Sequence, residues 1–125
     1  QMDAVTLHCP KTKETTNMFS AEEFDAMKST SILINCARGG IVNEKALYDA
    51  LTKNKIRSAG LDVYDDEPST SSNPLFSLDN ILLSPHIAGV TQEATIRMSK
   101  QAVQNVLDVF DNKVDPDVII NKNVL

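Results

Sequence analysis

The sequence predicts an α/β protein in which four parallel strands form one sheet with flanking helices. Two observations lead to this prediction. Short apolar runs that end at turn residues recur along the chain, and segments with helical spacing fill most of the gaps between them. The order strand, helix, strand, helix, strand, loop, strand, helix is typical of a parallel sheet with right-handed crossovers and helices on its faces.

The first strand is expected in DAVTLHC, which we interpret as a buried strand that Pro10 ends. The segments SILINC, SAGLDVY and NILLS provide the other three strands, and Pro85 closes the last of them. A strand-like triplet, Val118 to Ile120, lies in the C-terminal tail. The four main strands therefore occupy residues 3–9, 31–36, 58–64 and 80–84.

Capping residues and apolar spacing predict the helices. Ser20 and Glu23 have the spacing of a capping box, which predicts a short helix to about Lys28. Asn43 can cap a second helix, whose apolar residues fall on one face. A longer helix opens at Thr91. Its apolar stripe is expected to face a core or another domain and consists of Ala94, Met98, Ala102, Val103, Val106, Leu107 and Phe110.

Composition excludes several classes of protein. The chain has 125 residues and a net charge of −5, and its basic residues are scattered, which argues against binding to nucleic acid or to an anionic membrane. No apolar run approaches the roughly 20 residues needed to cross a bilayer. Two cysteines are too few for a disulfide framework, and no signal-peptide pattern is present, so we expect a cytoplasmic protein.

Polar residues with chemical potential lie at or after the ends of three predicted strands: Arg38, Asp62, Glu67 and His86. Ligands bind at the carboxyl ends of the strands in such sheets, so these side chains are expected to lie together. A guanidinium can hold a carboxylate, an imidazole can transfer a proton, and a carboxylate can orient the imidazole and favour its charged form. Such a site suits an acid with an adjacent carbonyl or hydroxyl group, and it needs a hydride carrier because no side chain supplies a hydride.

A metal site is the competing interpretation of the same region. His8, Cys9 and His86 could act as ligands, but the residue spacings expected of a zinc site are missing. We therefore expect no metal.

Five motifs resemble those of the D-isomer-specific 2-hydroxyacid dehydrogenases, a family that includes phosphoglycerate dehydrogenase and hydroxypyruvate reductase. In order, they are LHCP with TKET, INCARGGIVNEKAL, AGLDVYDDEP, NPLF and ILLSPHIAGVTQEA, and the resemblance covers about residues 3–112. The resemblance implies a Rossmann-type fold and hydride transfer between nicotinamide and C2 of a small 2-hydroxy or 2-keto acid. NAD is the implied cofactor, with NADP left open.

The resemblance also implies roles for individual residues. Arg38 matches the residue that binds the substrate carboxylate, His86 matches the proton donor, and Glu67 matches its partner. Asp62 matches the acid that positions the nicotinamide carboxamide. The residues implied to line the cofactor are Cys9, Pro10, Thr15, Cys36, Ala37, Arg38, Asp62, His86, Ala88 and Gly89.

The chain departs from the family pattern upstream of these motifs. Its glycines stand only at positions 39, 40, 60 and 89, so the G-x-G-x-x-G turn that cradles a pyrophosphate is missing. We interpret residues 1–112 as the second half of an NAD-binding domain and residues 113–125 as a tail that returns to a separate substrate domain. We expect the chain by itself to be inactive and to form a homo-oligomer or to need a missing N-terminal portion, because its first strand would be an exposed edge.

Two alternatives remain open. The chain could be a non-catalytic module that senses NAD or binds a protein, although a pure sensor has no use for a proton donor and its partner carboxylate. Formate dehydrogenase shares the fold, but the resemblance implies Gln at the position of Glu67 in that enzyme.

Overall fold

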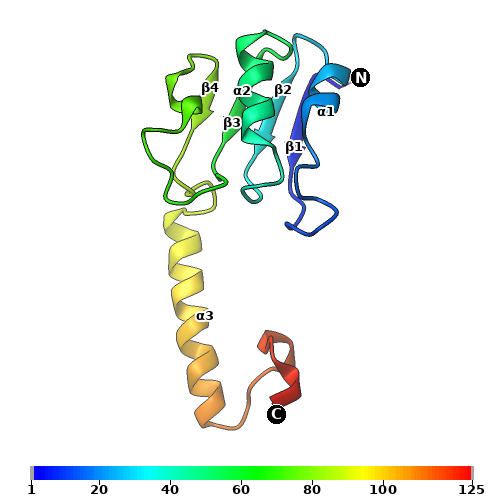
Figure 1. Cartoon of the computed structure of the whole chain (residues 1–125). Coiled ribbons are helices and arrows are strands. Elements are labelled where there is room, and N and C mark those ends of the chain that lie inside the picture. Colours follow the sequence, from blue (N-terminus) through cyan, green and yellow to red (C-terminus); the bar gives the residue numbers. More distant parts are fainter. Residues whose placement is uncertain (1, 125) are drawn as a thin grey trace. The chain divides into compact units, whose positions relative to one another are not determined.

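The computed structural model describes residues 2–124, which divide into two compact units. The boundary between them in the sequence falls between Ala88 and Gly89. The first unit contains a parallel sheet whose strands lie side by side in sequence order (Figure 1). The strands are β1 (Ala4–Leu7), β2 (Ile32–Asn35), β3 (Ser58–Leu61) and β4 (Ile81–Leu83). The predicted α/β fold with a four-stranded parallel sheet is therefore confirmed.

Two helices connect the first three strands, and both cover the same face of the sheet (Figure 1). They are α1 (Ala21–Ala26) and α2 (Glu44–Thr52), and a short 3₁₀ helix, η1 (Pro74–Ser77), precedes β4. The sequence analysis predicted flanking helices. Strands added in one direction by crossovers of one hand put every connection on one side, which explains why both helices lie on one face.

Capping residues set the starts of the helices as predicted. The Glu23 carboxylate accepts a hydrogen bond of 2.8 Å from the Ser20 amide, and the Asn43 side chain accepts one of 2.9 Å from the Ala46 amide. These bonds satisfy polar groups that a helix terminus leaves without an intrahelical partner. The first helix ends at Ala26, slightly before the predicted end.

The core lies between the covered face of the sheet and the two helices. Leu33 in β2 is fully buried, as are Leu47 in α2 and Ile56 in the connection to β3. Their burial removes apolar surface from water, which is the main favourable contribution to folding. The remaining core residues on this side include Leu7, Phe24, Ile41, Ala50, Leu51, Ala59, Leu61 and Leu75.

The opposite face of the sheet is open in the described chain. Ile34 in β2 pairs with Gly60, which pairs with Leu82, so these residues form a row across the sheet. Leu82 is 77% exposed and Ile34 is 37% exposed. The prediction of a buried first strand is wrong for the same reason: β1 is an edge strand with one uncovered face, and only its last residue, Leu7, is buried.

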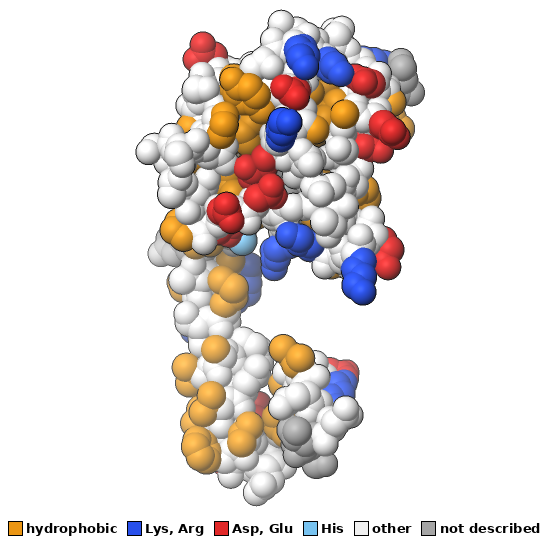
Figure 2. Space-filling model, in the orientation of Figure 1, with side chains coloured by type: hydrophobic (Ala, Val, Ile, Leu, Met, Phe, Trp, Pro, Cys, Tyr) orange, Lys and Arg blue, Asp and Glu red, His pale blue; other side chains and the backbone are white. Residues whose placement is uncertain are grey.

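The second unit consists of one long helix and two short 3₁₀ turns. These are α3 (Gln92–Phe110), η2 (Pro116–Val118) and η3 (Lys122–Val124). The apolar stripe of α3 is exposed and visible in Figure 2, with Met98 at 59% and Phe110 at 78% exposure, so it forms no core within the described residues. None of the helices in residues 2–124 combines the length and apolar character needed to cross a membrane.

The strand-like triplet predicted in the tail is absent. Asp115 accepts a hydrogen bond of 2.9 Å from the Asp117 amide and caps a 3₁₀ turn that begins at Pro116. This local capping bond competes with an extended conformation, and Pro116 fits the first position of such a turn. Residues 118–120 therefore form no strand.

Candidate active site

The turn after β2 presents Arg38 at the carboxyl edge of the sheet. Asn35, the last residue of β2, is buried, and its side chain accepts a bond from the Ala37 amide and donates one to the Arg38 carbonyl, each 3.0 Å long. Arg38 is exposed, and its guanidinium donates to the Ala37 carbonyl at 2.7 Å. Asn35 thus shapes the turn that carries Arg38. The sequence analysis missed this role, although a polar residue at the end of a buried strand was a usable signal.

Gly39 explains why a glycine follows the arginine. A Cβ atom at this position would overlap the carbonyl group of Tyr64, because the turn after β2 lies directly against the backbone beyond β3. Gly40 has a φ of 77°, a region that glycine adopts without strain. Gly39 therefore lets the turn after β2 and the backbone after β3 approach closely, and Gly40 accommodates the positive φ of the turn.

We expect Gly39→Ala to lower the free energy of unfolding by about 3 kcal/mol, because the new methyl group must displace backbone. Urea denaturation followed by circular dichroism measures this loss. Gly60→Ala is the matched control, since its Cβ would only approach Ile34 Cγ1 at 4.0 Å. Equal stabilities of the two variants would contradict this account of Gly39.

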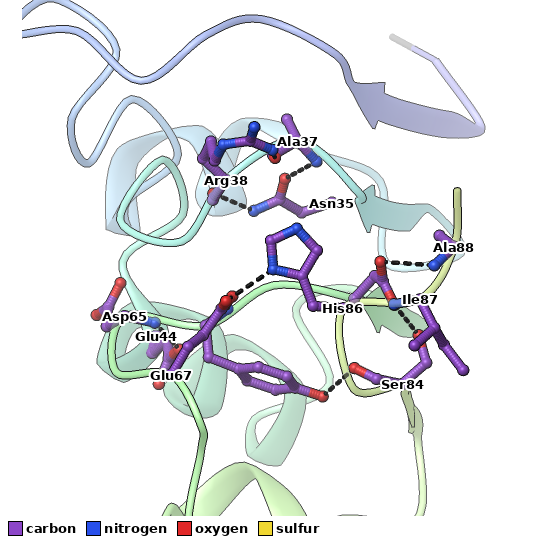
Figure 3. A network of polar contacts seen from close by, with 12 residues as sticks. Asn35, Ala37, Arg38, Glu44, Asp65, Glu67, Ser84, His86, Ile87 and Ala88 are labelled. Atoms are coloured by element: carbon purple, nitrogen blue, oxygen red, sulfur yellow. Dashed lines mark hydrogen bonds and ion pairs between the residues drawn. The ribbon is translucent and has the colours of Figure 1, made fainter. Parts of the chain in front are cut away.

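His86 and Glu67 form a direct pair. His86 Nδ1 lies 2.7 Å from Glu67 Oε2, while Glu67 Oε1 accepts a bond of 2.9 Å from the Tyr64 amide (Figure 3). Both side chains are reachable, with 48% of His86 and 34% of Glu67 exposed. The structure therefore brings together the imidazole and the carboxylate that the sequence analysis paired.

The surroundings of Glu67 keep its carboxylate ionised. The hydrogen bond from His86, followed by that from the Tyr64 amide, lowers the pKa of Glu67 below its ordinary value. The positive charge of Arg38 acts in the same direction, which places Arg38 within electrostatic reach of the pair. In Figure 3 the imidazole lies on the side of Glu67 that faces the turn from Asn35 to Arg38.

A lowered pKa makes the stability contribution of Glu67 depend on pH. The contribution is complete above the ordinary pKa of about 4.5 and is lost as the pH falls through the lower pKa of the folded state. We expect Glu67→Gln to be less stable than wild type at pH 6, with the difference shrinking at pH 3.5. Urea denaturation at both pH values measures this, and Asp66→Asn in the same exposed loop is the control. A difference that does not vary with pH would contradict the ion pairing.

Asp62 is buried at the end of β3, with 3% of its surface exposed. Burial by itself raises the pKa of Asp62, but hydrogen bonds from Ser84, Ala88 and Ile87 outweigh this effect and lower the pKa. The three donors belong to the segment after β4 that carries His86. Asp62 therefore joins the end of β3 to the loop of the predicted proton donor.

Five of the ten residues implied to line the cofactor share one cavity. It has a volume of about 600 Å³, and its walls include Cys9, Pro10, Cys36, Ala37 and Arg38. His8 and Lys11 complete the cavity. Its position past the ends of β1 and β2 agrees with the expected place of a ligand in a parallel sheet.

The other five residues implied to line the cofactor lie outside this cavity, and Asp62 and His86 are two of them. The Thr15 hydroxyl donates to the Pro10 carbonyl at 2.8 Å and accepts from the Thr12 amide at 2.7 Å, so it holds the loop after β1 together. Gly89 opens the second unit, and its contact with a cofactor stays a prediction. Ala88 belongs to the first unit, where its amide binds Asp62.

A second cavity, of about 490 Å³, borders the pair of His86 and Glu67 from another side. Its walls are largely apolar and include Tyr64 and Phe76, whose rings stack with centroids 6.0 Å apart. Within residues 2–124, no three His, Cys, Asp or Glu side chains are grouped so as to hold a metal ion. His8, one of the alternative ligands, has its Nε2 atom 2.8 Å from the Thr6 hydroxyl.

Comparison with known proteins decides the family. The model for "D-isomer specific 2-hydroxyacid dehydrogenase, NAD binding domain" matches residues 1–88. The chain belongs to this family. The match ends where the first compact unit ends, and it confirms both the resemblance of the motifs and the prediction of an NAD-binding domain. The predicted division at residue 112 stays a prediction.

Individual relatives show how much of the family architecture the chain represents. It is 42% identical over 107 residues to a D-3-phosphoglycerate dehydrogenase of Archaeoglobus fulgidus, covering 86% of this chain and 20% of that protein. A D-isomer specific 2-hydroxyacid dehydrogenase of Lactobacillus delbrueckii ssp. bulgaricus, solved with NAD, superposes with a TM-score of 0.81 at 30% identity, covering 95% of this chain and 40% of the other. The chain thus spans well under half the length of both.

One solved relative carries the other form of the cofactor. An NADPH-dependent glyoxylate/hydroxypyruvate reductase of Sinorhizobium meliloti, in complex with NADP and malonate, superposes with a TM-score of 0.78 at 34% identity. The superposition covers 86% of this chain and 34% of the other. Structures of the family therefore include NAD and NADP complexes, in agreement with the expectation of NAD with NADP left open.

Proposed function

We propose that this chain supplies the catalytic edge of the nucleotide-binding domain in an NAD-dependent enzyme that interconverts small 2-hydroxy and 2-keto acids. The observation that carries the proposal is the 2.7 Å pair of His86 and Glu67, exposed at the same edge of the sheet as Arg38. A proton donor, its carboxylate partner and a carboxylate receptor are the groups that reduction of a 2-keto acid requires of the protein.

Each of these side chains has a separate task. Arg38 binds the substrate carboxylate through its planar guanidinium, which can donate two parallel hydrogen bonds. His86 holds Nδ1 against Glu67, which leaves Nε2 to donate a proton to the carbonyl oxygen as the alcohol forms. Glu67 keeps its negative charge and orients the ring through its bond to Nδ1.

The residues of the cavity beside Arg38 fit the nicotinamide end of the cofactor. Pro10, Cys36 and Ala37 offer small side chains and backbone around a space of about 600 Å³ at the carboxyl edge. The bound cofactor supplies or accepts the hydride, which no side chain can do. Because the sequence lacks a glycine-rich phosphate turn, we expect residues 1–125 alone to bind NAD weakly and to be inactive.

The test is turnover by the full-length protein with a matched pair of substrates. Hydroxypyruvate and hydroxyacetone share a ketone and a hydroxymethyl group, and only hydroxypyruvate has a carboxylate for Arg38. We expect oxidation of NADH with hydroxypyruvate and a kcat/KM at least about 1,000-fold lower with hydroxyacetone. Without a substrate carboxylate, the Arg38 guanidinium is left unpaired in the site. Cofactor binding with no turnover of any 2-keto acid would favour a module that senses NAD.

A further inference from the structure

His86 lies in a backbone conformation that needs support. Its φ is 57°, in the left-handed region that residues other than glycine seldom adopt. The segment that carries it, residues 84–88, follows β4 without forming a helix or strand. Such a conformation persists only where neighbouring groups determine it. Neighbouring residues must therefore hold His86 in place.

The pair with Glu67 is too exposed to hold the segment alone. About half of the His86 side chain and a third of the Glu67 side chain are open to solvent, and exposed ion pairs contribute little to stability. The constraint has to come from more deeply buried contacts. These contacts lie on both sides of His86 in the sequence.

Asp62 makes three hydrogen bonds to the segment. Its Oδ1 atom accepts from the Ser84 hydroxyl at 2.5 Å and from the Ile87 amide at 2.9 Å, and its Oδ2 atom accepts from the Ala88 amide at 2.9 Å. One of these bonds precedes His86 in the chain and two follow it. A single buried carboxylate therefore ties together both ends of the turn that carries the imidazole.

Tyr64 adds a second attachment from the same strand end. Its hydroxyl donates to the Ser84 carbonyl at 2.9 Å, while its amide donates to Glu67. Ser84 thus contacts the end of β3 through both its side chain and its backbone. Asp62 and Tyr64, which both bond to Ser84, lie in the segment after β3 that also carries Glu67.

We propose that Asp62 and Ser84 are positioning residues that clamp residues 84–88 and thereby aim the His86 imidazole at Glu67 and the substrate. This inference rests on the proposed function. It differs from the role that the family resemblance implies for Asp62, which is contact with the nicotinamide carboxamide, and it gives Ser84 a role in the site.

Two variants of Ser84 and one of Asp62 test the clamp without relying on turnover. Amide hydrogen exchange in the full 125-residue chain measures the bonds of Ile87 and Ala88. We expect exchange of both amides to be at least about 10-fold faster in Ser84→Ala and faster still in Asp62→Asn, with wild-type protection restored in Ser84→Thr. Ser77→Ala is the matched control, since its hydroxyl bonds only to the Pro74 carbonyl within η1.

The imidazole itself reports on the same variants. The chain has two histidines, His8 and His86, so the ring signals in an NMR spectrum are easily separated. Ser84→Ala is expected to change the ring signals of His86 and to leave those of His8 unchanged. Unaltered His86 signals and unaltered exchange in Ser84→Ala would overturn the clamp. The Ser84 series decides this even if Asp62→Asn does not fold.

Kinetics of the full-length protein separate positioning from cofactor contact. A clamp predicts that kcat falls about 10-fold in Ser84→Ala and about 100-fold in Asp62→Asn, with the dissociation constant for NADH changed less than about 2-fold. Weaker NADH binding in Asp62→Asn, together with an unchanged kcat in Ser84→Ala, would overturn it. If wild type turns over no 2-keto acid, the proposed function fails, while exchange and ring signals still decide whether the clamp exists.

Discussion

His86→Gln is expected to lower the kcat of the full-length protein for reduction of a 2-keto acid about 1,000-fold, within the range that general acid catalysis contributes. Gln preserves much of the side-chain volume and can still bond to Glu67, but it has no proton to donate near neutral pH. Steady-state oxidation of NADH gives kcat, and fluorescence titration gives the affinity for NADH, which is expected to stay within about 3-fold of wild type.

A double variant sharpens this test. Glu67 is proposed to act through His86, to which it bonds at 2.7 Å, so Glu67→Gln should lower kcat in the wild-type background and have little further effect beside His86→Gln. Full additivity of the two changes in free energy would mean that Glu67 acts independently of the imidazole. A kcat within about 10-fold of wild type in His86→Gln would place the proton donor elsewhere.

Arg38→Lys is expected to lower kcat/KM for a 2-keto acid about 100-fold. Lys keeps the positive charge but loses the planar pair of donors that matches a carboxylate, so the loss tests geometry as well as charge. Because a single ammonium also orients the substrate less firmly against His86 than a planar guanidinium does, we expect both a higher KM and a lower kcat. The measurement is steady-state kinetics with hydroxypyruvate.

Arg57→Lys is the matched control for this substitution. Arg57 is exposed and directly precedes β3, whereas Arg38 follows the carboxyl end of β2, so the same chemical change occurs at the other end of the sheet. Its kinetic constants should equal those of wild type. Equal losses in the two variants would show that the effect of Arg38→Lys is not specific to the substrate site.

The fold could be predicted because its signals are local. Apolar runs bounded by turn residues located β1 to β4, and Asn43 and Thr91 located the starts of α2 and α3 through caps that the structure contains. The errors concern environment. The strand β1 is apolar enough to be buried, but burial depends on a neighbour, and the described residues cover only one of its faces. The contact of the α3 stripe with another domain stays a prediction. Periodicity shows that a face is apolar and cannot show what covers it.

The residue types of the candidate site could be proposed from the sequence, whereas several residues that support it could not. Arg38, Glu67 and His86 were proposed because each follows a strand, and all strands of a parallel sheet end at one edge. Ser84 and Tyr64 were missed because their bonds join residues that are close only after folding, such as the Tyr64 hydroxyl and the Ser84 carbonyl 20 positions away. The contacts made by Asn35 and Thr15 were missed for a different reason, since the partners of each lie within a single turn or loop.

By itself the sequence determined the order of strands and helices, the residue types at the carboxyl edge and the family to which the chain belongs. Only the tertiary structure decided that Asp62 turns inward, that Gly39 lies against Tyr64, and that His86 adopts a left-handed conformation. The physical reason is that strand and helix propensities arise from neighbouring residues, whereas the direction of a polar side chain depends on which donors and acceptors the fold brings to it.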